Sequence, residues 1–141
     1  QEKLAPWMQP IFDNLELLIN NTSAKKGSKR DSYHELMERG MLVVEPLTYI
    51  RGRSIPNQHM IVDESQNLTP HEMKTIVSRA GEGTKIVLTG DPNQIDNTDV
   101  NLSSNGLSTL VESFKGSQLA GHVRFTSVER SALAELAANV L

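Results

Sequence analysis

A short apolar run that ends in two adjacent carboxylates constrains this chain more than any other feature. Residues 59–63 (His-Met-Ile-Val-Asp) lead into Glu64, and polar turn-forming residues follow directly. This pattern is typical of a buried parallel strand that brings acids to the carboxyl edge of a sheet, the edge where ligands bind in α/β folds. Because neighbouring carboxylates repel each other, we expect Asp63 and Glu64 to hold a cation.

A second strand supports this interpretation, because an Asp-Glu pair alone is usually a solvated surface turn. Residues 85–89 (Lys-Ile-Val-Leu-Thr) are also strand-like and lead into the sequence Gly-Asp-Pro-Asn-Gln at 90–94. A helix-like segment separates the two strands, as a βαβ crossover requires. Both strands should therefore carry polar ends to the same edge of a parallel sheet.

In nucleotide hydrolases, paired acids of this kind divide two tasks. The first acid orients waters on Mg²⁺, a hard ion that keeps much of its hydration shell, and the second orients or deprotonates the attacking water. On this interpretation Asp63 would hold Mg²⁺ through water, and Glu64 would act on the attacking water.

The composition is that of one globular α/β domain with a modest core. Of 141 residues, 38% are hydrophobic and 22% are charged, and the formal net charge is −3. The absence of cysteine excludes disulfides and thiolate chemistry and fits a cytoplasmic location. No apolar run reaches about 18 residues, so we expect no membrane span.

Two local groups of basic residues stand out against the slightly acidic balance of the chain. The first lies within residues 25–30 and is interpreted as a solvated loop. The second consists of Arg51 and Arg53 on either side of Gly52, a glycine that would let another backbone approach closely. Two roles are open for these arginines: phosphate contacts with RNA, or ion pairs within the protein.

Hydrophobic periodicity and capping residues predict five helices. They cover residues 10–20, 32–40, 69–81, 105–115 and 131–141. Pro10 is expected in the first turn of the first helix, and Thr69 begins a capping box. Gly40, Gly81 and Gly116 are expected to end the second, third and fourth of these helices, respectively.

Three further apolar segments are strand-like, namely residues 41–44, 47–50 and 122–126. Pro46 lacks a backbone N–H and lies between the first two, so at least one of them should be an edge strand or irregular. Glu129 stands three residues after Thr126 and before an apolar run, and we interpret it as a capping glutamate rather than a catalytic acid.

Six segments carry a resemblance to a known family. They are residues 3–10 (KLAPWMQP), 49–58 (YIRGRSIPNQ), 63–72 (DESQNLTPHE), 80–96 (AGEGTKIVLTGDPNQID), 105–107 (NGL) and 121–136 (GHVRFTSVERSALAEL). Together they resemble the PhoH-like phosphate-starvation ATPases, in particular the branch fused to an amino-terminal PIN nuclease domain. The resemblance implies an α/β fold with a RecA-like P-loop NTPase core, binding and hydrolysis of ATP with Mg²⁺, and a helicase-like role on RNA. It also allows a homo-oligomeric ring.

The resemblance implies roles for individual residues. Asp63 and Glu64 correspond to the Walker B acids, and Asp91 and Gln94 to the sensor of the γ-phosphate. Arg130 stands where superfamily 1 helicases and ring ATPases aim an arginine at the γ-phosphate, and the alternative is an ion pair on the helix surface. Glu64, Gln94 and Arg130 are thus candidate catalytic residues. Asp63 and Asp91 are candidate nucleotide-binding residues, and Asp63 is the candidate Mg²⁺ ligand.

One departure from the family's pattern concerns phosphate binding. A P-loop has the sequence Gly-x-x-x-x-Gly-Lys-Ser/Thr, whose backbone amides and lysine hold the phosphates. The 141 residues do not contain it, because residues 81–85 have the order wrong and follow a helix, and residues 27–29 fail equally. We therefore expect a single partial ATPase domain that lacks its first strand and P-loop and is inactive by itself. Residues 1–57 would be a helical or irregular lead-in, and residues 58–141 would contain the Walker B, sensor and final strand-helix units.

The resemblance also predicts the strand order. In RecA-like sheets the sensor strand lies between the P-loop strand and the Walker B strand, so residues 59–63 and 85–89 should pair directly. Strand 122–126 would normally pair with the absent strand, so it should lie at an exposed edge, shift to the sensor strand or pair with another chain. Two other functions remain open: a non-catalytic RNA-binding or protein-interaction module, and a plain α/β scaffold.

Overall fold

The computed structural model describes residues 5–22, 33–126 and 131–140 of the chain. The chain forms two compact units, Gln1–Tyr49 and Ile50–Leu141, and the expectation that both belong to one partial domain stays a prediction. The second unit has the expected α/β architecture, with helices and a small parallel sheet. In the described ranges, no helix combines the length and the apolar character that a membrane crossing needs.

The first unit contains two helices, α1 (Ala5–Thr22) and α2 (Tyr33–Glu38). They contact each other through the rings of Phe12 and Tyr33, which stack with their centroids 5.4 Å apart. Helix α1 is longer than expected and carries Pro10 in its interior, so the placement of this proline in the first turn was wrong. A proline there removes one backbone hydrogen bond, and the turns on either side continue the helix.

Two predictions concern the segment after α2. Gly40 adopts a left-handed backbone with a φ of 67°, as expected for a helix stop. Residues 41–46 are irregular, and η1 (Leu47–Ile50) is a 3₁₀ turn in which Tyr49 N–H donates to the carbonyl of Pro46 at 3.0 Å. Neither of the strand-like segments 41–44 and 47–50 forms a strand, and the expectation that at least one of them is irregular is confirmed. Pro46 supplies an acceptor but no donor, which suits a tight turn better than a strand ladder.

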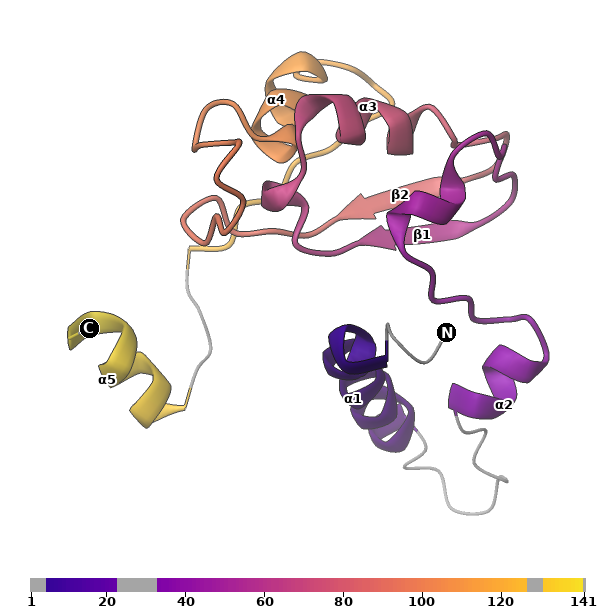
Figure 1. Ribbon diagram of the computed structural model, residues 1–141, viewed down its shortest axis with the longest axis horizontal. Coiled ribbons are helices and arrows are strands. Elements are labelled where there is room, and N and C mark those ends of the chain that lie inside the picture. Colours follow the sequence, from indigo (N-terminus) through magenta and orange to yellow (C-terminus); the bar gives the residue numbers. More distant parts are fainter. Residues whose placement is uncertain (1–4, 23–32, 127–130, 141) are drawn as a thin grey trace. The chain divides into compact units, whose positions relative to one another are not determined.

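The sheet of the second unit consists of two parallel strands, β1 (His59–Val62) and β2 (Lys85–Leu88), whose first and last residues are paired in register. Helix α3 (Pro70–Val77) connects them. This confirms the βαβ unit and the direct pairing that the sequence predicts. Both arrows point toward the loop that follows β2, so the carboxyl ends of the two strands share one edge (Figure 1).

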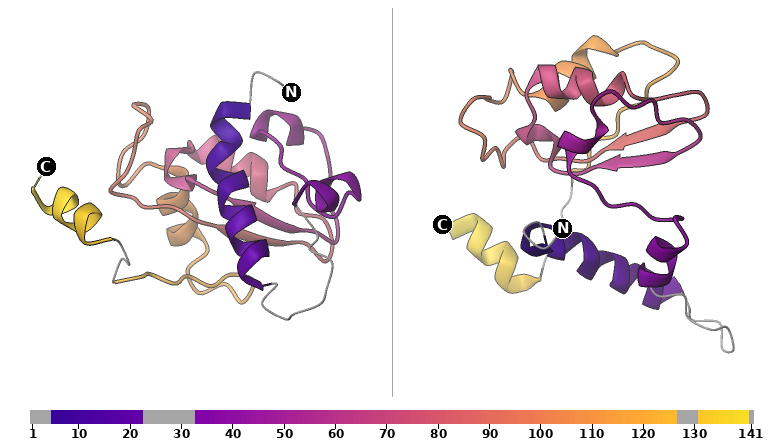
Figure 2. Two further views of the ribbon diagram at one scale, coloured as in Figure 1. Left: turned by 90° about the horizontal axis from the view of Figure 1, so that it is seen from below. Right: turned by 45° about the vertical axis from the view of Figure 1, so that its right-hand side comes forward.

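Helices α3 and α4 (Gly106–Ser113) cover one face of this sheet (Figures 1 and 2). The core lies between these helices and the sheet. Met73 and Ile76 of α3 are 2% and 1% exposed, and Val62 of β1 is 5% exposed. Burial of each such side chain contributes about 1.5–3 kcal/mol to stability. Residues 50–126 leave the opposite face of the sheet open, where Ile61 is 74% exposed.

Helix α3 begins with the capping box that the sequence predicts. The N–H of Glu72 donates to the hydroxyl of Thr69 at 3.2 Å, and the N–H and hydroxyl of Thr69 both donate to the Glu72 carboxylate at 2.9 Å. The two hydrogen bonds that the Glu72 carboxylate accepts lower its pKa below the ordinary value of 4.5. The bond from the Thr69 N–H has the larger effect, and the bond from the Thr69 hydroxyl has the smaller one. Partial burial opposes the shift, and the nearby charge of Arg51 adds to it.

Gly81 does not end α3, contrary to the prediction, because the helix already ends at Val77. Gly81 instead lies against Pro56, where a Cβ atom would come within 2.9 Å of backbone atoms. Its N–H donates to the carbonyl of Ile55 at 2.8 Å. The glycine thus permits a close approach of two segments, a tertiary requirement that looks like a helix stop in the sequence.

The elements after β2 are those that the sequence predicts, with the exception of one strand. Asn105 caps α4 by accepting the N–H of Ser108 at 2.9 Å, and Gly116 has the φ of 82° expected of a stop. Residues 122–126 are exposed and form neither an edge strand nor a partner of β2, so two of the three expected arrangements were wrong, and pairing with another chain stays a prediction. A strand needs a partner for its N–H and C=O groups, and no described segment pairs with this one. Helix α5 (Ala132–Val140) lies within the range predicted for the last helix.

The contact of α4 with the turn before α3 depends on Gly106. Its N–H donates to the carbonyl of Leu68 at 2.6 Å, and a Cβ would meet the carbonyl oxygens of Leu68 and Thr69 at 3.0 and 2.9 Å. We expect Gly106→Ala to lower the free energy of unfolding by about 1–3 kcal/mol, as measured by urea unfolding. Gly121→Ala is the control, because nothing lies within 4 Å of a Cβ there. Equal midpoints for the two variants would contradict this contact.

The capping box should make stability depend on pH in the acid range. Because the pKa of Glu72 is lower in the folded state than its ordinary 4.5, the charge stabilises the fold above that value, and this contribution is lost as pH falls through the folded-state pKa. Glu72→Gln keeps a capping side chain without the charge. Wild type should therefore be more stable than Glu72→Gln at about pH 7 and should lose this advantage at about pH 3. Thermal melts measure the difference, with Glu82→Gln at an exposed position as the control; a difference that is constant with pH would refute the argument.

Candidate functional site

Hydrogen bonds join the ends of β1 and β2 beyond their last paired residues. The N–H of Thr89 donates to the carbonyl of Val62, and the N–H of Ser65 donates to the carbonyl of Thr89, both at 2.9 Å. The Ser65 hydroxyl donates to the same Thr89 carbonyl at 2.6 Å. The two loops that follow the strands therefore leave the sheet side by side, and both carry residues that the sequence marks as site candidates.

Asp63 follows β1 with its side chain exposed. Its Oδ1 accepts a hydrogen bond from the hydroxyl of Thr89 at 2.7 Å, so a residue after the neighbouring strand orients the carboxylate. An exposed and oriented carboxylate fits Mg²⁺, which binds oxygen ligands and keeps several of its waters. In the part of the chain that the structure describes, no group of three or more His, Asp or Glu side chains is placed to hold a metal.

Glu64 has a left-handed backbone conformation, with φ 52° and ψ 35°. Among the described residues, Asn57 is the other residue besides glycine with positive φ. Asparagine tolerates this region, but glutamate costs about 1–2 kcal/mol there because Cβ crowds a carbonyl oxygen. Strain of this kind occurs preferentially at functional sites, and here it lies on the residue predicted to act on water.

The loop after β2 forms a turn, residues 91–94, that is organised by Asp91. One carboxylate oxygen of Asp91 accepts the N–H of Asn93 at 2.9 Å, and the other accepts the side-chain amide of Gln94 at 2.6 Å. The N–H of Gln94 also donates to the carbonyl of Asp91 at 2.9 Å. Asp91 therefore holds Gln94 in place. The direct contact of Asp91 with a nucleotide stays a prediction.

A buried glutamine that the sequence did not mark joins the two loops. Gln66 is 0% exposed. Its Nε2 donates to Oε2 of Glu64 at 2.6 Å and to the carbonyl of Gln94 at 2.8 Å, and its Oε1 accepts the N–H of Asp91 at 3.2 Å. One amide thus contacts three of the predicted site residues. In the sequence it is a polar residue in a polar run, which does not distinguish a buried amide from a surface one.

The two loops approach closely around this amide. A Cβ at Gly90 would lie 2.5 Å from Oε1 of Gln66 and 3.0 Å from a methyl group of Leu107, so the position requires glycine. Asn67 adds a second link, because its Oδ1 accepts the N–H groups of residues 96 and 97 at 2.7 and 3.1 Å. All three residues of the short 3₁₀ helix η2 (Ser65–Asn67) therefore bond through their side chains to the segment after β2.

Comparison with known proteins identifies the family. The family model for PhoH-like proteins matches residues 1–141. The chain belongs to the PhoH family. It is 56% identical over 141 residues to Protein PhoH2 of Bacillus subtilis, a match that covers 100% of this chain and 31% of that protein. Protein PhoH2 of Mycolicibacterium smegmatis is 40% identical over 140 residues, with coverages of 99% and 30%. A PhoH-like protein of Bacillus subtilis is 38% identical over 96 residues, with coverages of 68% and 27%. The chain thus spans less than a third of the length of these relatives.

The remaining predicted residues of this PhoH chain lie away from the two loops or outside the described residues. Arg51 and Arg53 are exposed on either side of Gly52, which has a φ of 76°. The charge of Arg51 makes a minor contribution to the lowered pKa of Glu72, and the choice between its two roles stays a prediction. A contact of either arginine with RNA stays a prediction. Arg130 lies outside the described residues, and its role stays a prediction as well.

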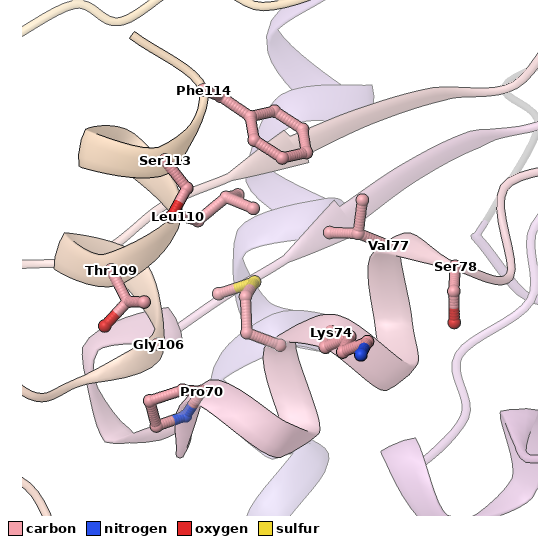
Figure 3. Close-up of a pocket in the computed structure, with 10 residues that line it drawn as sticks. Pro70, Lys74, Val77, Ser78, Gly106, Thr109, Leu110, Ser113 and Phe114 are labelled. Carbon is pink, nitrogen blue, oxygen red and sulfur yellow. The ribbon is translucent and has the colours of Figure 1, made fainter.

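A pocket of about 440 Å³ lies elsewhere in the PhoH chain, between α3 and α4 (Figure 3). Its walls are mainly apolar and include Val77, Leu110 and Phe114, with Lys74 also at the lining. None of residues 63–69, which lead from β1 to α3, and none of residues 89–105, which lead from β2 to α4, lines it. This pocket is therefore not the site that the sequence predicts.

The left-handed backbone at Glu64 predicts an unusual order of stability among its variants. Glu64→Gly and Glu64→Ala remove the same carboxylate, but only glycine is free of the penalty for positive φ. We expect Glu64→Gly to be more stable than Glu64→Ala by about 0.5–1 kcal/mol in urea unfolding, since this relief exceeds the extra entropy that glycine loses on folding. The matched pair Glu82→Gly and Glu82→Ala, at an exposed position without positive φ, should show the opposite order. If the glycine variant were less stable than the alanine variant at position 64 as well as at position 82, strain at Glu64 would be ruled out.

Proposed function

We propose that this chain supplies the catalytic edge of an ATP-hydrolysing PhoH protein with a RecA-like P-loop core. The observation that carries the proposal is the joining of two loops at one sheet edge, where Gln66 bonds to Glu64 after β1 and to the turn of residues 91–94 after β2. Ligands of open α/β sheets bind at this carboxyl edge. Membership in the PhoH family supports a nucleotide as the ligand, and ATP is the nucleotide we propose.

The arrangement suits a different task for each residue of the edge. Asp63, exposed and oriented by the neighbouring strand, would hold Mg²⁺ through water. When bound, Mg²⁺ neutralises charge on the phosphate oxygens. Glu64, held by Gln66, would orient and deprotonate the attacking water. Gln94, fixed by Asp91, would contact the γ-phosphate.

We further propose that the phosphate-binding loop of this protein lies outside the 141 residues. The sequence contains no Gly-x-x-x-x-Gly-Lys-Ser/Thr run, and the chain covers 31% of PhoH2 of Bacillus subtilis. Parallel sheets are normally covered on both faces. The open face at Ile61, and the presence of two strands in the described sheet, support a partial core that further strands and helices complete.

Three parts of the proposal rest on family membership and not on contacts in this structure. They are helicase-like action on RNA, assembly into a homo-oligomeric ring, and an approach of Arg130 to the γ-phosphate. The tasks of Asp63, Glu64 and Gln94 do not depend on any of them.

Substitution of the two acids separates their proposed tasks. In a protein that carries the P-loop together with this chain, Glu64→Gln should lower kcat for ATP by about 10²–10⁴-fold and leave nucleotide binding nearly unchanged, because it removes a base and no phosphate contact. Asp63→Asn should instead raise the Mg²⁺ concentration that gives half-maximal activity. ATPase assays with a Mg²⁺ titration, and titration with a fluorescent ATP analogue, measure these effects.

Two comparisons complete this experiment. Glu82→Gln changes an exposed carboxylate before β2, at the other end of that strand, and should retain full turnover. The 141-residue chain by itself should hydrolyse no ATP, because it lacks the P-loop amides and lysine that offset phosphate charge. Turnover of Glu64→Gln within about threefold of wild type would overturn the assignment of Glu64.

A further inference from the structure

The side-chain amide of Gln66 contacts both loops of the candidate site at once. An amide nitrogen has two hydrogens, and those of Gln66 serve the Glu64 carboxylate at 2.6 Å and the Gln94 carbonyl at 2.8 Å. The amide oxygen accepts the N–H of Asp91 at 3.2 Å. Because the side chain is 0% exposed, bulk water does not reach it to replace a partner that moves away.

These contacts couple the position of Glu64 to the turn of residues 91–94. Leaving a buried amide group without a partner is unfavourable, so a displacement of the turn must either break a hydrogen bond of Gln66 or draw its side chain along. The space is also limited, because a Cβ at Gly90 would already overlap the amide oxygen. Either response changes the donor that holds the Glu64 carboxylate.

We propose that Gln66 is a positioning residue that makes the orientation of the Glu64 carboxylate depend on the turn of residues 91–94. The inference rests on the proposed function, since it deepens the role of Glu64 as the base for the attacking water. Gln66 itself touches neither the nucleotide nor the water. It transmits a displacement of the turn, caused by a phosphate contact of Gln94, to the base.

A purely structural role for Gln66 is the alternative, and Ser65 provides the comparison. Ser65 is also 0% exposed and also joins the two loops, but its hydroxyl donates to the backbone carbonyl of Thr89 and not to an acid. A positioning residue acts on turnover through Glu64, whereas a structural residue acts through the fold. The two roles differ in whether the effect on kcat disappears once Glu64 has been replaced.

A double-mutant cycle tests the proposal in the protein that carries the P-loop. Gln66→Met keeps the length of the side chain and removes its polar atoms. It should lower kcat by about 10–100-fold and change KM for ATP by less than about twofold. In a Glu64→Gln background the same substitution should cause no further loss of kcat, because the group that it positions is already gone. Single-turnover hydrolysis with enzyme in excess measures the slow variants.

Two more variants separate positioning from misfolding. Gln66→Glu keeps the shape of the side chain and the acceptor for the Asp91 N–H, but replaces both donors with a carboxylate that faces Glu64. It should therefore lower kcat at least as much as Gln66→Met. Ser65→Ala should lower the melting temperature, and any effect that it has on kcat should multiply with that of Glu64→Gln.

A measurement in the protein that carries the P-loop needs no ATP. Glu64→Gln should shift the amide NMR resonances of Asp91 and Gln94 when Gln66 is present, because the amide connects the two loops. In the Gln66→Met background the same substitution should leave these resonances in place.

The outcomes separate failure of this inference from failure of the proposed function. Multiplicative losses of kcat for Gln66→Met and Glu64→Gln, or shifts at Asp91 that persist without Gln66, would overturn the positioning role in a protein that still hydrolyses ATP. Absence of ATP hydrolysis in the unsubstituted protein with its P-loop would overturn the proposed function, and the positioning role with it.

Discussion

The parallel pairing of β1 and β2 is the constraint on which the rest of the site depends. Because the last residues of the two strands are in register, the chain leaves both strands at one edge, and the hydrogen bond from Ser65 to Thr89 extends the contact beyond the strands. An antiparallel pair would send the two loops to opposite ends of the sheet. The parallel register therefore decides that Glu64 and the turn of residues 91–94 can be joined at all.

Buried polar side chains make the contacts across this edge. Ser65, Gln66 and Asn105 are the buried polar residues of the described part of the chain, and no buried side-chain nitrogen or oxygen among the described residues lacks a hydrogen-bond partner. Such a network is stable only when each member is bonded, so it specifies one arrangement of the loops. Gly90 permits it, because a Cβ at this position would overlap the amide oxygen of Gln66.

The site combines this rigid support with residues that remain open to a ligand. Asp63 and Gln94 are exposed, whereas the side chains of η2 that hold the two loops are largely buried. Glu64 connects the exposed residues to the buried supporting side chains. It is itself exposed, has a left-handed backbone and accepts a hydrogen bond from Gln66. Positioning is thus carried by groups that water does not reach, and the groups suited to chemistry face the solvent from which a nucleotide would approach.

The sequence by itself determined the features whose signals are local. Strand periodicity, the capping box of Thr69 and the left-handed Gly40 depend on neighbours a few residues away, and the two acids at a strand end were recognisable for the same reason. Only the tertiary structure decided what holds those acids. Gln66 bonds to groups 25 and 28 residues along the chain, and such partners follow from the strand register and not from the residues beside it. Likewise residues 122–126 have the composition of a strand but are not one, because a strand exists only where another segment pairs with its backbone.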